Sequence, residues 1–160
     1  MSEPRHNKGN SEQEVATPGE LIRAVTRRFG PIAWDLAANE WNSWGELGYY
    51  SKEQDSLAQD WTLHNGLLWL NPEFGFIKPW AKKCFRSTLT PGRSILMLTP
   101  FTTAKWACDW TWEKAYVIGL KGRVKFVGHS IGYPKDLMLS LYGTGITGFE
   151  VWDWREVAGC

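Results

Sequence analysis

Residues 66–75, GLLWLNPEFG, join a short apolar run to a turn. The run GLLWL predicts a strand that is buried on both faces, because it is apolar throughout and does not alternate with polar residues. The proline and the glycine that follow end its hydrogen-bond ladder at once. A buried strand that runs directly into such a turn is typical of a functional loop at the end of a strand.

The turn NPEF (71–74) brings together three groups that can bind an aromatic amine. Asn71 offers a side-chain carbonyl, Pro72 holds a backbone carbonyl in place, and Phe74 offers a flat face. The exocyclic nitrogen of adenine is a poor nucleophile because its lone pair is conjugated with the ring. Two acceptors that form hydrogen bonds with its two hydrogens favour a pyramidal nitrogen, whose lone pair is available for attack. The alternative is an ordinary turn, since Asn-Pro is a common turn initiator.

On either side of this segment the sequence predicts alternating helices and strands. Thr17 suits the N-cap and Pro18 the first position of a helix that ends at Gly30. Residues 77–86 predict a basic helix with its apolar residues on one face. The remaining pattern predicts strands at 32–37, 91–100, 115–120, 123–128, 136–143 and 148–154, a Trp-rich helical stretch at 102–112, and an irregular region at 40–65.

These elements predict the α/β class, with a single Rossmann-like domain over residues 17–160. Its sheet is expected to be mostly parallel, with an antiparallel C-terminal edge. Ligands bind outside the carboxyl ends of the strands in such sheets, so Asp35 and residues 71–74 should open onto one crevice. Residues 1–16 carry too few apolar side chains to offset the entropy of ordering and are expected to form a disordered tail.

The charge of the chain is nearly balanced but unevenly distributed. Lys+Arg 18 against Asp+Glu 17 gives +1 at pH 7, which excludes nucleic-acid binding by bulk charge. Residues 74–108 contain basic residues and no acidic ones. Residues 40–60 contain several acidic residues and only one basic residue, a lysine. Binding to nucleic acid is therefore expected to be local, and two solvated faces are the alternative reading.

Other residue types exclude several classes of function. The three cysteines have no metal-ligand spacing, no apolar run is long enough to cross a membrane, and a reducing cytoplasm is expected. The three histidines are scattered and are predicted to be structural or to face solvent. Among the tryptophans, those at 106, 110 and 112 suggest packing, while Trp41, Trp44 and Trp61 are the better candidates for stacking on a ring.

Five blocks, taken in chain order, resemble the phage and prophage DNA adenine-N6 methyltransferase (Dam) family. They are TPGELIRAVTRRFGPIAWDLAANEWN (17–42), YYSKEQDSLAQDW (49–61), GLLWLNPEFGFIKPWAKKC (66–84), SILMLTPFTTAKW (94–106) and GRVKFVG (122–128). The resemblance covers about residues 17–143. It implies a compact, Rossmann-like enzyme of the S-adenosylmethionine-dependent methyltransferase type, without a large target-recognition domain.

The resemblance further implies methyl transfer from S-adenosylmethionine to N6 of adenine in double-stranded DNA, without a metal. Such an enzyme is expected in the cytoplasm of a bacterial host, where it would protect phage DNA from restriction. The implied catalytic residues are Asn71, Pro72, Glu73 and Phe74. The implied cofactor-binding residues are Thr17, Pro18, Asp35, Ala37, Ala38, Asn42 and Asp55. The basic helix after the loop is expected to hold DNA phosphates through Lys78, Lys82, Lys83 and Arg86.

Glu73 departs from the family pattern, which has a second proline at this position. A carboxylate beside a DNA-binding pocket would repel phosphate. It would point away from the site, pair with Lys78, or mark a relative that binds cofactor or DNA without transferring methyl groups. A methyltransferase that acts on another amine is a further alternative, suggested by the net charge of +1.

The segment KGRVKFVG (121–128) alternates like a strand and carries three basic residues. It is predicted to be either an exposed sheet edge protected by charge or a hairpin that contacts phosphate.

Overall fold

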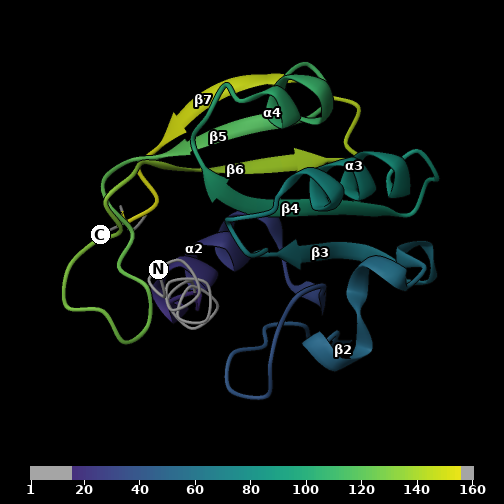
Figure 1. Ribbon diagram of the computed structural model, residues 1–160, viewed down its shortest axis with the longest axis horizontal. Coiled ribbons are helices and arrows are strands. Elements are labelled where there is room, and N and C mark those ends of the chain that lie inside the picture. Colours follow the sequence, from purple (N-terminus) through teal and green to yellow (C-terminus); the bar gives the residue numbers. More distant parts are fainter. Residues whose placement is uncertain (1–15, 156–160) are drawn as a thin grey trace, which may run out of the picture.

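The structure is a computed structural model that describes residues 16–155. The predicted tail, apart from its last residue, lies outside the described residues. The described part forms one open sheet with helices packed on both faces, as Figure 1 shows. No helix within it is long and apolar enough to cross a membrane.

The sheet has seven strands in the spatial order β2-β1-β3-β4-β6-β5-β7. The strands are β1 (Ile32–Asp35), β2 (Gly48–Tyr49), β3 (Gly66–Leu70), β4 (Arg93–Pro100), β5 (Tyr116–Leu120), β6 (Leu137–Tyr142) and β7 (Gly148–Trp152). The helices are α2 (Gly19–Phe29), α3 (Lys78–Ser87) and α4 (Lys105–Trp110). Three short 3₁₀ helices lie between β2 and β3: η1 (Lys52–Gln54), η2 (Ser56–Ala58) and η3 (Trp61–Leu63).

The strand directions place most carboxyl ends at one edge of the sheet. Strands β2, β1, β3 and β4 are parallel neighbours. Strand β6 is antiparallel to both β4 and β5, and β7 is parallel to β5. All strands except β6 therefore end at the same edge, called the carboxyl edge below. The predicted Rossmann-like α/β class, with a mostly parallel sheet and antiparallel pairing toward the C-terminus, is confirmed.

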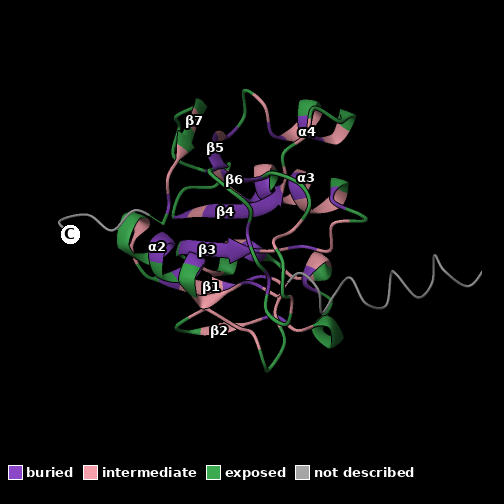
Figure 2. Cartoon of the chain, turned by 90° about the vertical axis from the view of Figure 1, so that its left-hand side faces the viewer, coloured by how far each residue is buried: buried purple, intermediate pink, exposed green. Residues whose placement is uncertain are grey.

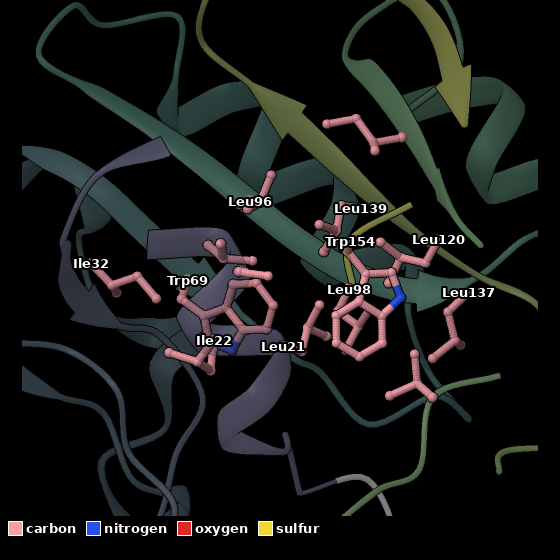
Figure 3. Packing of buried hydrophobic residues seen from close by; sticks show 14 of the residues in the cluster. Leu21, Ile22, Ile32, Trp69, Leu96, Leu98, Leu120, Leu137, Leu139 and Trp154 are labelled. Atoms are coloured by element: carbon pink, nitrogen blue, oxygen red, sulfur yellow. The ribbon is translucent and has the colours of Figure 1, made fainter. Parts of the chain in front are cut away.

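Helix α2 covers one face of the sheet, and α3 and α4 cover the other (Figure 2). Figure 3 shows Leu21 and Ile22 of α2 close to Trp69 of β3 and Leu98 of β4. On the opposite face, Cys84 of α3 belongs to a second buried cluster together with the other side of the same strands. Burying a large apolar side chain contributes about 1.5–3 kcal/mol. Central strands covered on both faces need no polar alternation, which explains the continuous apolar runs.

The first helix begins later than the sequence predicts. Pro18 takes the N-cap position and Gly19 is the first helical residue, with no side-chain cap. The Thr17 hydroxyl is instead bonded to Asn71, which lies 54 residues away in the chain. Helix α2 ends as expected, since Gly30 has a φ of 97°, a conformation that favours glycine.

The prediction of a strand at 123–128 is wrong, because no ladder forms there. Val124 and Phe126 are buried in the core, and the alternation reflects this burial. The backbone of the segment bonds to Tyr133 and Ala16 rather than to a neighbouring strand. The Trp-rich helix is shorter than predicted, at 105–110, and the irregular region contains β2 and the three 3₁₀ turns.

Candidate active site

A cavity of about 480 Å³ opens where β1 and β3 reach the carboxyl edge. It joins the ends of the two strands that carry Asp35 and the NPEF turn. The candidate residues that line it are Thr17, Asp35, Ala37, Ala38, Asn42, Asp55, Asn71 and Glu73. Pro18, Pro72 and Phe74 are not part of its wall.

Asp35 ends β1 and is buried, with 1% of its surface exposed. Its carboxylate accepts hydrogen bonds from the backbone N–H groups of Ala37 at 3.2 Å and Trp44 at 3.0 Å. Burial raises the pKa of Asp35 to about 7, although these two bonds lower it. A cation that enters the cavity beside this carboxylate would stabilise its charged form.

Gly45 allows the loop after β1 to approach Asp35 closely. A Cβ at this position would lie 2.6 Å from the backbone nitrogen of Asp35 and 2.2 Å from the carbonyl oxygen of Gly48. These contacts are too short for any residue with a side chain. The glycine therefore permits the arrangement that aims the Trp44 N–H at the buried carboxylate.

Thr17 connects Asn42 and Asn71, two residues that line the cavity. Its backbone N–H donates to Asn42 Oδ1 at 3.2 Å, and Asn42 Nδ2 donates to the Thr17 carbonyl at 3.0 Å. Asn71 Nδ2 donates to Thr17 Oγ1 at 2.9 Å. This last bond fixes the amide so that its nitrogen faces Thr17. The carbonyl oxygen is then the end of Asn71 that can accept from an amine.

The rest of the NPEF turn is packed into the protein. Pro72 is buried. The Phe74 ring meets Phe126 and Tyr133 edge to face, with centroid distances of 6.1 and 5.6 Å. Phe74 therefore holds the turn against residues 126–133 and does not line the cavity.

Glu73 is half-buried and lines the cavity. Its carbonyl accepts from the N–H of Phe76 at 3.3 Å, which closes the turn. The residue that departs from the family pattern is therefore part of the cavity wall. No ion pair joins it to Lys78 within residues 16–155.

The remaining wall includes residues that the sequence did not single out. Ser51 forms a capping box with Gln54 at the start of η1, and Asp55 takes a left-handed conformation between η1 and η2. The apolar side chains among the unpredicted wall residues include Leu57, Phe76 and Trp80. Trp80 lies in the first turn of α3, whereas Phe76 precedes the helix, so no helical spacing in the sequence links these two wall residues.

The basic residues of α3 do not form one uniform patch. Lys78, Lys82 and Arg86 recur every four residues and so form a row along the helix. Lys83 Nζ donates to the Leu57 carbonyl at 2.9 Å, and burial lowers the pKa of this lysine. A second hollow, of about 420 Å³, is lined by Leu57, Thr62, Pro79, Lys82, Lys83, Arg86 and Ser87. Lys78 is not among these residues.

The prediction that Trp61 stacks on a ligand ring is wrong. Trp61 is fully buried, and its Nε1 donates to the Ser56 carbonyl at 3.0 Å, so it belongs to the core. Trp44 is partly buried against the core, and Trp41 is 86% exposed. Of the two roles predicted for the histidines, structural or facing solvent, His64 has the structural one, since its ring stacks on Trp34 at 4.1 Å.

The model of the family described as DNA N-6-adenine-methyltransferase (Dam) matches residues 6–137, which is most of the chain. No curated protein matches the sequence.

Proposed function

Because the chain belongs to the DNA N-6-adenine-methyltransferase (Dam) family, we propose that it transfers a methyl group from S-adenosylmethionine to N6 of adenine in double-stranded DNA. The observation that carries this proposal is the junction at Thr17. One buried threonine is bonded to Asn42, on the side expected to hold the cofactor, and to Asn71 of the catalytic motif. Methyl transfer requires donor and acceptor at a fixed separation, which such a junction supports.

The cavity suits S-adenosylmethionine in size and in the groups that it offers. Its volume lies within the usual range for small-molecule sites. Asp35 would bind the amino group of the cofactor through a charge-assisted hydrogen bond, which would offset the cost of its burial. Leu57, Phe76 and Trp80 offer an apolar wall for an adenine ring, with Asp55 nearby for ribose hydroxyls. When bound, the cofactor supplies a methyl group activated by a positively charged sulfur.

The other candidate residues would shape the same site. Thr17 and Asn42 hold the wall together, and Pro18 directs the chain into α2. Ala37 and Ala38 have small side chains that leave space beside Asp35. None of these five residues would form or break a covalent bond in the reaction.

The NPEF turn would bind the target amine. The Asn71 side-chain carbonyl and the Pro72 backbone carbonyl would accept its two hydrogens, which localises the nitrogen lone pair for attack. Because adenine in a duplex is stacked and paired, it must turn out of the helix to reach this turn. Phe74 would support both acceptors by holding the turn against the core.

Helix α3 would hold DNA phosphates next to the site. It begins directly after the catalytic turn, and Lys78, Lys82 and Arg86 would meet the backbone along one row. Lys83 would contribute charge at the second hollow while remaining bonded to the Leu57 carbonyl. Protection of phage DNA from restriction, in the cytoplasm of a bacterial host, is the biological role that we propose for this activity.

A second candidate is a relative that binds cofactor and DNA without turnover. The position of Glu73 favours it, because a carboxylate in the cavity wall stands where the family has a neutral, rigid proline. Both candidates bind cofactor and DNA, and only the first transfers a methyl group.

Labelled S-adenosylmethionine, unmethylated DNA and a digest that maps the labelled base test these proposals. Incorporation at N6 of adenine, lost in Asn71→Ala, supports the leading function. Binding of cofactor and DNA without incorporation identifies the second candidate. Transfer to a non-DNA amine alone would identify a different substrate. Absence of cofactor binding by calorimetry refutes every one of these functions.

A further inference from the structure

The connection between β5 and β6 is much longer than its geometry requires. The two strands are adjacent and antiparallel, yet residues 121–136 join them. Hairpin loops of about two to five residues are enough for such pairs. Because β5 ends at the carboxyl edge, this 121–136 loop lies at the same edge as the catalytic turn, and Figure 1 shows it in green at the left of the molecule. Extra length at this edge is typical of a binding loop.

The inner side of the 121–136 loop is fixed to the active site. Phe126 is 2% exposed, and it and Tyr133 contact the ring of Phe74 in the catalytic turn. The Val127 N–H donates to the carbonyl of Ala16 at 3.1 Å, directly before the Thr17 junction. The loop is therefore tied to both segments that build the cavity, and its outer side stands in a defined position beside them.

The outer side combines positive charge with apolar surface. Val127 and Ile131 are 53% and 75% exposed, and Lys125 and Lys135 are exposed as well. Within residues 16–155, no ion pair involves either lysine. The other basic side chains of the loop are paired, Lys121 with Asp153 and Arg123 with Asp136. The only carboxylate on the loop is thus already neutralised, and the outer side is net positive.

We propose that the outer side of the 121–136 loop contacts the DNA duplex beside the flipped adenine, an inference that rests on the proposed methyl transfer to DNA. Lys125 and Lys135 pair with backbone phosphates, and Val127 and Ile131 contact sugars or base edges. The charge selects this partner, because a phosphate backbone complements unpaired lysines. With α3 on the other side of the catalytic turn, the loop gives the duplex a second line of contact.

Binding of a fluorescently labelled, unmethylated duplex at about 50 and about 200 mM salt tests the lysines. Lys125→Ala and Lys135→Ala should each weaken binding several-fold and reduce the slope of log K against log salt by about 0.9, the value for one phosphate contact. Lys114→Ala is the matched control, since Lys114 is exposed but precedes β5 at the opposite edge of the sheet. Its slope should equal that of the wild type. Equal slopes for Lys125→Ala, Lys135→Ala and the control overturn the proposal.

Ile131→Ser tests the apolar contact separately. It should weaken binding and leave the salt slope unchanged, because an apolar contact releases no counterions. Unchanged affinity, as expected if the loop receives a protein partner, overturns the assignment of this side chain to DNA. Methyl transfer by the wild type is measured in parallel. Its absence overturns the proposed function, whereas slopes that match the control overturn the loop assignment alone.

Discussion

Replacing Asp35 by asparagine should change how the stability of the protein depends on pH. Burial raises the pKa of Asp35 from its ordinary 3.8 to about 7 in the folded protein. The folded state therefore binds a proton more tightly than the unfolded state does. This contribution to stability is fully present below pH 3.8 and is lost as pH rises through 7. The total loss is about 4 kcal/mol at 1.36 kcal/mol for each tenfold change in proton affinity.

About 2–3 kcal/mol of this loss falls between pH 5 and pH 8. An asparagine side chain cannot ionise, so Asp35→Asn should gain that amount relative to the wild type over the same interval. Every other group titrates alike in the two proteins and cancels from the difference. The substitution also has a cost that is the same at both pH values. The amide nitrogen of asparagine must face the N–H of Ala37 or of Trp44, and two donors that face each other lower the unfolding free energy by about 1–3 kcal/mol.

Urea unfolding of both proteins at pH 5 and pH 8 measures this difference directly. A difference in unfolding free energy that stays constant between the two pH values would show that Asp35 does not titrate near 7, and the reasoning would be refuted. Calorimetry extends the test to function. Binding of S-adenosylmethionine near pH 6 should release a proton from Asp35, and Asp35→Asn should abolish this release and weaken binding by about 1.5–3 kcal/mol.

Four further substitutions test the site and the fold. Asn71→Ala should lower methylation by at least about 100-fold while cofactor affinity stays within a few-fold; an active variant would end its catalytic assignment. Thr17→Val should lower the methylation rate up to about tenfold, because it removes the hydroxyl oxygen that orients Asn71. An unchanged rate would show that this hydrogen bond does not contribute to catalysis. Glu73→Gln should tighten DNA binding, with a gain that shrinks at high salt; if turnover is lost instead, the carboxylate takes part in the reaction. Arg93→Ala should lower the unfolding free energy by at least about 3 kcal/mol in urea, because the buried guanidinium donates to four backbone carbonyls and one amide, and a smaller loss would contradict that role.

The order and type of most elements could be predicted from the sequence because these depend on local patterns. GLLWL is a strand over the predicted residues, and the helix before Gly30 and the basic helix after the NPEF turn both exist. A parallel sheet follows from their alternation, since parallel strands need crossovers. The place of the cavity follows in turn, because the carboxyl ends of parallel strands share an edge.

Segment 123–128 shows where local patterns fail. Its alternation is real, but Val124 and Phe126 alternate because they pack into the core, and no neighbouring strand pairs with them. Periodicity reports which side chains are buried and not what the backbone bonds to. Trp61 is a similar case, since its burial depends on η2 and α3 packing around it.

The sequence by itself determined the α/β class, the strand ends that carry Asp35 and Asn71, and the resemblance that links them to methyl transfer. Only the tertiary structure decided that Thr17 bonds to Asn71, that Asp35 is buried deeply enough to titrate near 7, and that Phe74 faces Phe126. The physical reason is distance along the chain. Burial and hydrogen bonds between residues tens of positions apart depend on how whole elements pack, and no local spacing encodes them.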